Sequence, residues 1–535
     1  MGKTELGAAG EAAAFPANDA AAAASNKPSR QAYYALALLV LVNFFNLVDR
    51  NVMSIVGQSV KADLHLTDVQ LGFLMGTAFA VLYGVTGVAM GRISDALNRS
   101  RLMAAALALW CGLTALSGLA TSFVWLAAAR IGVGVGESAA SPCSQALLTE
   151  YFPPRNRAAA LGFYMVGVYL GAAGSLVLGA VVLQHWGAIC TALPGAACRI
   201  ASWRAAFFVV GAPGLLLAAL LYRLPDVRAR PIQAEASAPR VFVRELSAAV
   251  PPFTLFNLHG AGGVGAVGRN LALAAAVAAI ACGLGLATGD WPQWIALGVG
   301  GYSILTWGEV MRLRDPPLHR LTFGCPSFTL VVLGGALLSC YNSAVGAWSA
   351  PYVMRTLGAR PAAVGFYLGG ATALAAALSA SVGGWLVDRW RRRDVRGPLW
   401  VGIIALVGSA PLLGLLLRAP DVRTYACVLF FFILVTNCWV GGFAALLQDL
   451  VLPRMRGAAA ACLSLVTVLV GAGLGPYWVG KISQVTGSLA LGLLSMLAVV
   501  PVAVILLLFA ARGLSKETAD RRLGHALAAG EPPHP

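Results

Sequence analysis

Four ionisable residues lie inside long apolar stretches of this sequence: Asp49, Arg50, Arg130 and Glu137. A charged side chain deep in a bilayer costs about 2.5–3.5 kcal/mol on insertion scales, so each of these charges needs a reason to be there. A buried carboxylate can carry a proton, which makes Asp49 and Glu137 the candidate proton carriers. A guanidinium can bind a carboxylate or a phosphate, which makes Arg50 and Arg130 candidate binding groups for an anion. The alternative is a permanent ion-pair cluster that only fixes the packing of helices.

The four charges fall on two helical faces. At 3.6 residues per turn, Arg130 and Glu137 lie along one face, whereas Asn46 and Arg50 lie along another with Asp49 beside them. If the two helices meet, two acids and two bases share one site, and Asn46 becomes a further candidate substrate-binding residue. A change in the distance between a carboxylate and an arginine changes the proton affinity of the carboxylate. Motion at this site could therefore couple proton movement to the movement of a bound molecule.

The elements that carry these faces are predicted to cross a membrane. Apolar residues make up 59% of the 535 positions and charged residues 11%, against about 25% charged in an ordinary soluble domain. Stretches of about 20 apolar residues recur along the chain, long enough to cross a hydrocarbon core of about 30 Å. The sequence thus predicts an all-α polytopic membrane protein with fourteen transmembrane helices. The predicted spans are 34–58, 69–93, 101–121, 123–147, 157–183, 204–223, 269–288, 293–311, 327–349, 361–387, 398–418, 424–447, 458–480 and 488–511.

The ends and loops of the chain predict its orientation. Residues 1–32 are Ala-rich and polar and predict a disordered tail, and residues 512–535 predict a second tail. Arg and Lys are concentrated in loops of one parity, which the positive-inside rule places in the cytoplasm together with both termini. The net charge of +16 is dispersed over loop rims rather than gathered on one face, so we expect membrane lipids and not nucleic acid as partners. The expected location is a bacterial inner (plasma) membrane, with the chain as a monomer.

The chain also repeats itself. The segments LLTEYFPPRNRAAA (147–160) and LLQDLVLPRMRGAA (446–459) share seven identities in fourteen positions, at an offset of 299 residues. Two shorter motifs, each ending a span and followed by arginine, repeat at an offset of 293: Gly91-x-x-x-Asp95 and Gly384-x-x-x-Asp388. Two matches at nearly one offset indicate duplication. The predicted units are two six-helix bundles, 33–223 and 325–511, and a cytoplasmic linker, 224–324, that carries an inserted transmembrane hairpin, 269–311.

These motifs carry a resemblance to a known family. Six plus six helices with Gly-x-x-x-Asp-x-x-x-Arg after the second span of each half resemble the major facilitator superfamily. Within it, three features resemble the spinster-type branch: Gly132-Val133-Gly134-Val135-Gly136-Glu137, the pair Asp49-Arg50, and Pro153-Pro154-x-x-Arg157. The resemblance implies secondary active transport by alternating access, with the first and fourth spans lining a central cavity. Spinster-like relatives are associated with lysophospholipids and sphingoid lipids, so the resemblance also implies a lipid-like substrate.

The loop motifs have a different expected role. Glycines at the motif start permit close approach of helices, and the following aspartates can face a helix N-terminus in the opposite half. Arg99 or Arg389 can pair with Glu150 or Asp449. We expect these contacts to latch the cytoplasmic side; the alternative is that they are only positive-inside loop charges. The residues of this expected gate are Gly91, Asp95, Arg99, Glu150, Gly384, Asp388, Arg389 and Asp449.

The second half lacks the charges of the first. At the repeat offsets, Asp49 corresponds to Asn342 and Glu137 to Thr436. The second half instead offers amide and aromatic side chains suited to hydrogen bonding and to contact with an apolar body. Its candidate substrate-binding residues are Tyr341, Asn342, Trp348, Asn437 and Trp439. A cavity charged on one wall and aromatic on the other suits an amphiphile with a charged head.

Other classes of function have little support. The six His residues all lie outside the predicted spans, no metal-ligand spacing occurs, and the chain contains no Walker-type phosphate loop. We therefore expect no enzyme, no metal and no cofactor. Two alternatives to a proton-coupled carrier of an amphiphile stay open: proton symport of a small organic anion, and an uncoupled lipid facilitator or sensor. A disulfide between Cys190 and Cys198, in an expected outer loop, is chemically allowed.

Overall fold

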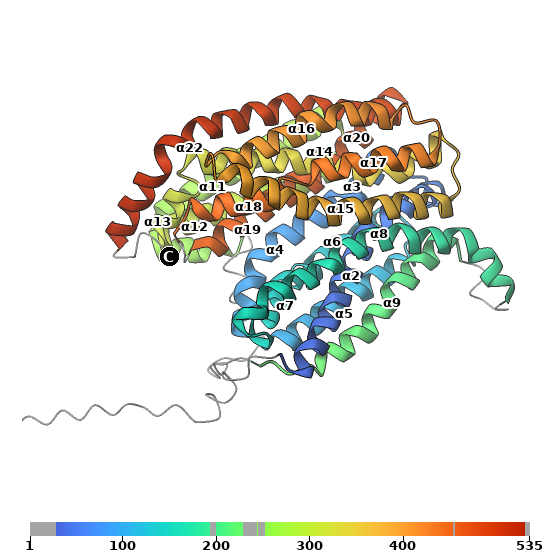
Figure 1. The fold of residues 1–535 in the computed structure, drawn as a ribbon, viewed down its shortest axis with the longest axis horizontal. Helices are drawn as coiled ribbons and strands as arrows, with labels where there is room; N and C mark the ends of the chain where they lie inside the picture. Colours follow the sequence, from blue (N-terminus) through green and yellow to red (C-terminus); the bar gives the residue numbers. More distant parts are fainter. Residues whose placement is uncertain (1–27, 193–199, 228–242, 244–251, 453–454, 530–535) are drawn as a thin grey trace, which may run out of the picture.

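The computed structural model describes residues 28–192, 200–227, 243, 252–452 and 455–529. Throughout these ranges the regular structure is helical (Figure 1). Thirteen described helical segments are long and apolar enough to cross a membrane. Six belong to the first half, six to the second, and one to the hairpin between them. The all-α membrane fold with two six-helix bundles is therefore confirmed.

The first half consists of antiparallel helices whose loops alternate between two ends of the molecule. Its helices are α2 (Arg30–Asp63), α3 (Asp68–Met75), α4 (Thr77–Ala96), α5 (Arg99–Ser117), α6 (Phe123–Glu137), α7 (Ala140–Tyr151), α8 (Pro154–Ala192) and α9 (Ser202–Tyr222). Helix α5 begins with Arg99, directly after the short loop that follows α4, and the end of the molecule to which this loop belongs is called here the Arg-rich end. The opposite end, where α2 ends and α3 begins, is called the outer end.

The second half follows the same plan. Its helices are α14 (Pro326–Thr356), α15 (Pro361–Arg391), α16 (Gly397–Leu416), α17 (Val422–Thr436), α18 (Val440–Asp449), α19 (Arg456–Val466), the π-helical η3 (Thr467–Ala472), α20 (Gly473–Thr486), α21 (Leu489–Ser495), the short η4 (Met496–Ala498) and α22 (Val499–Ala529). The two halves meet along two seams. At one seam α8 packs on α15, and at the other α3 and α4 pack on α20 and η3.

The fourth span of each half breaks at the same repeat position. In the first half α6 ends at Glu137, and in the second half α17 ends at Thr436, which is the repeat equivalent of Glu137 at the offset of 299. Both segments resume as a short helix after a two- to three-residue turn. The repeat seen in the sequence thus includes a local interruption of the helix. Glu137 and Asn437 lie at these interruptions, in the middle of their spans.

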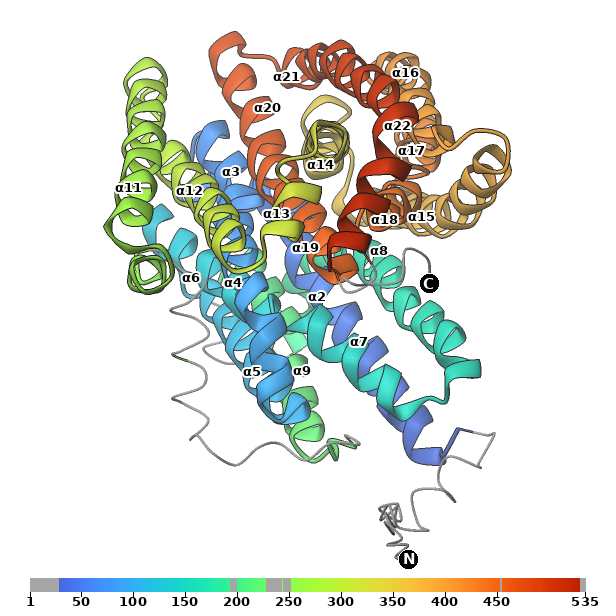
Figure 2. The same cartoon turned by 90° about the vertical axis from the view of Figure 1, so that its left-hand side faces the viewer.

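The inserted hairpin lies on the α4–α20 seam. It consists of α11 (Thr254–Thr288) and α12 (Trp291–Arg314), followed by α13 (Pro316–Leu321). Figure 2 shows α12 against the bundles and α11 at the periphery. Its turn binds both halves: the Gln293 amide accepts from Thr77 Oγ1 of the first half (2.7 Å) and donates to the Gly473 carbonyl of the second (3.3 Å). Asp290 also pairs with Lys481 (2.7 Å).

Several boundaries differ from the sequence prediction. Helix α2 begins at Arg30, inside the expected tail 1–32, and α22 continues to Ala529, through most of the expected tail 512–535. Helix α11 begins at Thr254, before the expected 269, because the glycine-rich segment is helical with a kink at Gly263, whose φ is +63°. Helix α12 is more polar than the thirteen apolar segments and completes the predicted pair with α11. Most of the first tail, residues 1–27, lies outside the described residues.

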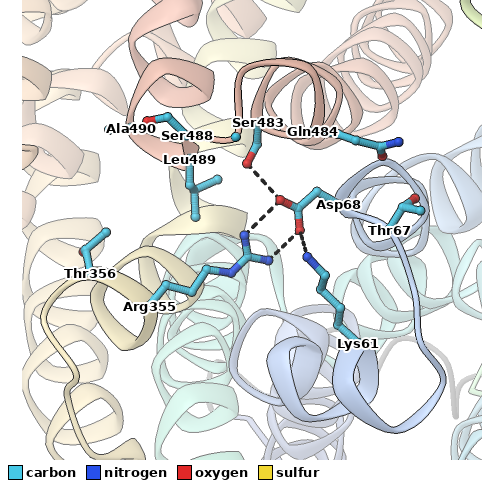
Figure 3. Close-up of a pocket in the computed structure, with 11 residues that line it drawn as sticks. Lys61, Thr67, Asp68, Arg355, Thr356, Ser483, Gln484, Ser488, Leu489 and Ala490 are labelled. Atoms are coloured by element: carbon cyan, nitrogen blue, oxygen red, sulfur yellow. Dashed lines mark hydrogen bonds and ion pairs between the residues drawn. The ribbon is translucent and has the colours of Figure 1, made fainter.

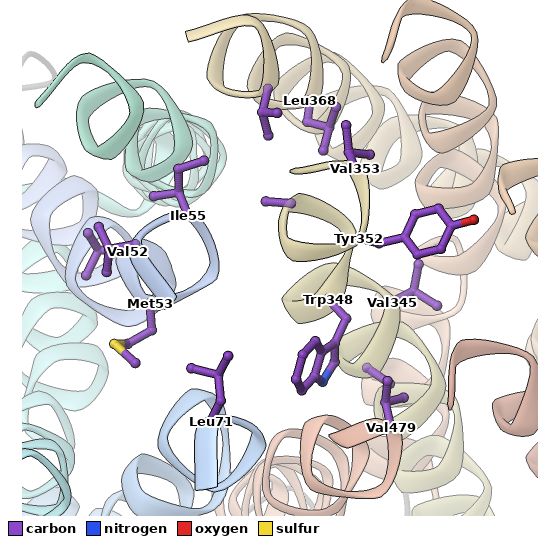
Figure 4. Close-up of a cluster of buried hydrophobic side chains, with 14 of the residues drawn as sticks. Val52, Met53, Ile55, Leu71, Val345, Trp348, Tyr352, Val353, Leu368 and Val479 are labelled. Atoms are coloured by element: carbon purple, nitrogen blue, oxygen red, sulfur yellow. The ribbon is translucent and has the colours of Figure 1, made fainter. Parts of the chain in front are cut away.

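The apolar core divides unequally between the two ends. One cluster contains residues of both halves, among them Val52 and Leu71 of the first half and Trp348 and Val353 of the second (Figure 4). A second cluster lies within the hairpin and the second half, around Phe443 and Leu507, and a third lies within the first half, around Trp110 and Leu147. The shared cluster includes the outer parts of α2 and α14. The halves are therefore joined at the outer end and have separate cores toward the Arg-rich end.

Candidate substrate and proton site

A cavity of about 700 Å³ lies between the two halves. Its lining runs along α15 from Leu368 to Gly384 and along α8 from Leu176 to Met165, so it extends from mid-molecule toward the Arg-rich end. Among its described lining residues Arg50 is the one charged group. The remainder is a mixture of small hydroxyl groups, amides and apolar side chains. A cavity with a single positive charge favours an anion with a partly apolar body.

Arg50 joins this cavity to a buried acid. Its Nη2 donates to Glu137 Oε2 at 2.9 Å and its Nε donates to the same oxygen at 3.3 Å. The guanidinium carbon lies 4.4 Å from the ring centroid of Phe79 and 4.9 Å from that of Tyr83. The Arg50 side chain is 27% exposed and the Glu137 side chain is fully buried. Arg50 therefore faces the cavity, with Glu137 behind it as its counter-ion.

Arg130 and Asp49 lie deeper, on the side of α2 away from the cavity. Arg130 Nη1 donates to the backbone carbonyl of Asp49 (2.9 Å) and its Nη2 to that of Arg50 (3.1 Å). Both Arg130 and Asp49 are buried, and Cys111 Sγ lies 3.8 Å from Asp49 Oδ2. Within the described part of the chain, Asp49 Oδ1 and Glu137 Oε1 have no hydrogen-bond partner. The structure thus brings all four charges together, and only Arg50 reaches the cavity.

The opposite wall of the cavity presents two amides. Asn342 Nδ2 donates to Asn437 Oδ1 at 2.8 Å, and Thr436 Oγ1 donates to Asn342 Oδ1 at 3.3 Å. Asn342 and Asn437 both line the cavity. The repeat equivalents of Asp49 and Glu137 have therefore become neutral hydrogen-bonding groups, which leaves Arg50 without an acid facing it from the second half among the lining residues.

The expected aromatic wall differs from what the structure shows. Trp348 Nε1 donates to the Pro476 carbonyl (2.8 Å), the Tyr341 hydroxyl donates to the Ser409 carbonyl (3.3 Å), and Trp439 packs edge-on against Phe443. All three side chains are buried in the protein and are absent from the cavity lining, as are Asn46 and Arg130. Phe432 and Tyr169 line the cavity instead. Helix rotation, which sequence spacing does not fix, turns the tryptophans into the packing between helices.

The expected gate residues pair within their own halves. Arg99 Nη2 lies 2.9 Å from Asp95 Oδ1, and its Nη1 pairs with Glu150. In the second half Asp449 pairs with Arg391 rather than with Arg389, whose guanidinium lies over Trp385. Asp388 lies in the last turn of α15. A side-chain carbon added at Gly91 or Gly384 would meet no described atom within 4 Å, so these glycines are not close-packing positions in this conformation. A latch between the halves stays a prediction for another conformation.

Sequence reasoning missed a cluster at the outer end. Arg355 of α14 donates from Nη2 to Asp68 Oδ1 (2.6 Å) and from Nη1 to Asp68 Oδ2 (2.9 Å), which links the second half to the first. Lys61 Nζ lies 2.5 Å from Asp68 Oδ1, and Ser483 Oγ donates to Asp68 Oδ2 at 2.8 Å. The available signal was a pair of basic residues, Lys61 and Arg355, at the ends of the first spans of the two halves. The matching acid lies 287 residues away from Arg355 in the chain.

Two further expectations concern a disulfide and a metal site. Cys198 lies outside the described residues, so the disulfide with Cys190 stays a prediction. Among the described residues no group of three or more His, Cys, Asp or Glu side chains is placed to hold a metal ion.

Comparison with known proteins decides the family. A model of the Major Facilitator Superfamily matches residues 39–352, which is more than half of the chain. The chain belongs to the major facilitator superfamily. The family and the relatives described next are transporters, so the expectation of a membrane transporter rather than an enzyme is confirmed. As a member of this superfamily, the chain is an integral membrane protein that carries small-molecule substrates.

Three similarities illustrate its relationships. The chain is 27% identical over 457 residues to an MFS-type efflux pump of Mycolicibacterium smegmatis, covering 85% of both proteins. It is 30% identical over 159 residues to the hexuronate transporter of Escherichia coli K12, covering 29% of this chain and 36% of that protein. Its fold matches a bacterial homologue of the lysosomal transporter Spinster in an inward-facing, unoccupied conformation, with a TM-score of 0.65, 21% identity and coverage of 91% and 97%. The resemblance to the spinster-type branch is thus confirmed at the level of fold.

Proposed function

We propose that this superfamily member is a proton-coupled secondary transporter of an organic anion whose acidic group binds at Arg50. The observation that carries the proposal is the position of Arg50. Its guanidinium is the one charged group on the described cavity lining and is paired there with the buried Glu137. An arginine on a water-accessible wall binds carboxylates and phosphates with charge-assisted hydrogen bonds.

Charge balance links the anion to a proton. In the empty site the Arg50 cation and the Glu137 anion neutralise one another. When the acidic group of a substrate binds Arg50, Glu137 loses its counter-charge while it stays buried, and a buried unpaired charge is strongly unfavourable. A proton on Glu137 restores neutrality. The empty pair and the loaded pair then carry the same net charge, so proton and anion move together in one direction.

Asp49 is the second candidate proton carrier. It lies beside Arg50 in the chain and is buried, and one of its carboxylate oxygens has no hydrogen-bond partner in the described part of the molecule. Arg130 supplies the neighbouring positive charge, but its guanidinium donates to backbone carbonyls of α2. We assign Arg130 to holding the carbonyls of residues 49 and 50 in place, which positions Arg50 toward the cavity.

The body of the substrate is expected to be partly apolar. Met165, Val168, Leu429 and Phe432 are apolar residues of the cavity lining, which favours the amphipathic anion that the spinster resemblance implies. A small hydrophilic anion is the second candidate. The amides Asn342 and Asn437 opposite Arg50 and the similarity to a hexuronate transporter favour it. Heat stabilisation of the purified protein by glucuronate or by a lysophospholipid separates the two, since a ligand raises apparent stability by mass action.

Flux measurements test the coupling. Purified protein in liposomes with an imposed pH gradient should accumulate the stabilising anion, and Glu137→Gln should abolish the dependence on the gradient while retaining the fold and anion binding. Glu309→Gln is the matched control, because Glu309 pairs with Arg269 (3.7 Å) and Arg312 (3.5 Å) in the hairpin, away from the cavity. Gradient-dependent flux that persists unchanged in Glu137→Gln would exclude Glu137 as the carrier. Flux that never depends on the gradient would favour an uncoupled facilitator.

Orientation in a bacterial inner membrane belongs to the same proposal. The arginines at the Arg-rich end support a cytoplasmic position for that end and for both termini. The cavity would then open toward the cytoplasm. Labelling of single cysteines at position 99 or 61 in intact cells with a membrane-impermeant reagent tests this, with position 61 expected to react and position 99 to be protected.

A further inference from the structure

A second pocket, of about 590 Å³, lies at the outer end beside the link between the halves (Figure 3). It shares no described lining residue with the Arg50 cavity. Figure 3 shows Asp68 among the lining side chains, with Arg355 and Lys61 on two sides of its carboxylate and Ser483 on a third. The rest of the lining mixes polar and apolar residues: Thr67, Thr356, Gln484, Gly487, Ser488, Leu489 and Ala490.

The charges that line this pocket do not balance. Two cations, Lys61 and Arg355, face one carboxylate, Asp68. The nearest further acid along the chain, Asp63, is bound by Arg204 Nη2 and by Trp203 Nε1, both at 3.1 Å. The pocket therefore has one positive charge more than its own acid neutralises.

The hydrogen-bond donors also exceed the acceptors. The Asp68 oxygens accept from both terminal nitrogens of Arg355, from Lys61 and from Ser483, which uses the roughly four acceptor sites of a carboxylate. Arg355 uses its Nε on Gln58 (2.6 Å). Of the five N–H groups of a guanidinium and the three of an ammonium, about four thus remain without a protein acceptor in the described region. Arg355 and Lys61 are 25% and 31% exposed, so these donors are open to a ligand.

We propose that this outer pocket is an anion-binding vestibule that takes the carboxylate of a water-soluble organic anion between Lys61 and Arg355. The surplus positive charge attracts the anion, and the unused donors of the two cations bind it. The hydroxyl groups of Thr67, Thr356 and Ser488 suit a hydrophilic body. The inference rests on the proposed function only for the class of anion, since the pocket is separate from the Arg50 cavity.

Binding in the vestibule would also loosen the link between the halves. Arg355 and Ser483 belong to the second half, whereas Asp68 and Lys61 belong to the first. An anion on the unused N–H groups of Arg355 shares the positive charge that otherwise faces Asp68 and so weakens the Arg355–Asp68 ion pair. An incoming substrate at the outer end thereby weakens the contact that must break before the outer end can open.

The test uses full-length protein in which the inner site has been removed. Glucuronate is titrated by calorimetry into Arg50→Gln, and one equivalent should still bind. The double variant Arg50→Gln/Lys61→Gln should bind at least about tenfold more weakly, as expected for loss of a charge-assisted hydrogen bond. Arg50→Gln/Lys481→Gln is the matched control and should bind as Arg50→Gln does, because Lys481 pairs with Asp290 outside the pocket.

Each result has a distinct meaning. Absence of glucuronate binding in Arg50→Gln, or binding that Lys61→Gln leaves unchanged, overturns the vestibule. Transport lost in Arg50→Gln with binding retained shows two sites and leaves the proposed function standing. Repeating the titration in nanodiscs with and without phosphatidylglycerol identifies the anion source. Competition by the lipid would assign the site to a phosphate headgroup and overturn the proposal of a soluble carboxylate.

Hydrogen exchange tests whether binding loosens the link between the halves. The exchange rate of backbone amides at residues 68–76 should rise when glucuronate binds.

Discussion

The two ends of this transporter use the same residue types in opposite ways. At the outer end the ion pair Arg355–Asp68 crosses from one half to the other, above a core cluster that both halves share. At the Arg-rich end the pairs Arg99–Glu150 and Arg391–Asp449 stay within one half, and each half has its own core. In the described part of the molecule, the halves thus share a core and an ion pair at one end and have separate cores toward the other, and the cavity extends toward the end with separate cores.

This difference shows which contacts define the conformation. Contacts within a half can persist while the halves rock against one another, whereas contacts across the seam must break. The outer ion pair and the close packing of Gly72 of α3 on Pro476 of α20 are therefore expected to control the balance between conformations. The pairs at the Arg-rich end are expected to stabilise the individual bundles.

The largest effect is expected from breaking the outer ion pair. Arg355→Gln removes both hydrogen bonds of the guanidinium to Asp68 and leaves that buried carboxylate with only Lys61 and Ser483. Loss of one partner of a buried pair costs about 3–5 kcal/mol, and the partial exposure of Arg355 places this case at the low end. Distances between spin labels on the outer ends of α2 and α14 should shift to a longer population.

Arg204→Gln provides the control for that experiment. Arg204 pairs with Asp63 at the same end of the molecule, but both belong to the first half. Its replacement should leave the label distances unchanged. Equal shifts in both variants would show that the conformation does not depend on whether an ion pair joins the two halves.

A smaller effect is expected from replacing a glycine of the outer seam by alanine. A carbon added at Gly72 of α3 would lie 2.5 Å from the Pro476 carbonyl oxygen of α20, closer than atoms tolerate. Gly72→Ala should therefore push the outer seam apart and lower the melting temperature, with an overpacking penalty of about 1–3 kcal/mol. Gly91→Ala is the matched control, because space is open there. Similar melting temperatures for the two variants would contradict the contrast between the ends.

The same comparison shows which features of the fold and of the site can be predicted from the sequence. Apolar spans and the internal repeat can each be recognised within short stretches of the sequence, so they predict two bundles of six helices. The rare charges predict a site because a buried charge is unfavourable wherever its helix points, and the structure brings Asp49, Arg50, Arg130 and Glu137 together. Which member faces the cavity depends on helix rotation, so Arg50 is there while Arg130 is not.

Two features lay beyond that reasoning for a physical reason. Trp348 and Trp439 belong to the packing between helices rather than to the cavity, since tilt and rotation are set by neighbouring helices. Asp68 and Arg355, which form the outer ion pair, are separated along the chain by most of the first half and by the linker. Spacing along one helix carries no information about such a contact.

The smallest effect is expected at the Arg-rich end. Asp449→Asn removes the partner of Arg391, and the two side chains are 37% and 40% exposed. Exposed pairs contribute about 0–1 kcal/mol, so the melting temperature should change little and, because the pair lies within one half, the distance between outer labels should stay the same. A shift in those distances comparable to that of Arg355→Gln would mean that the pair already acts between the halves. The division into an end where the halves are joined and an end where their cores are separate would then fail.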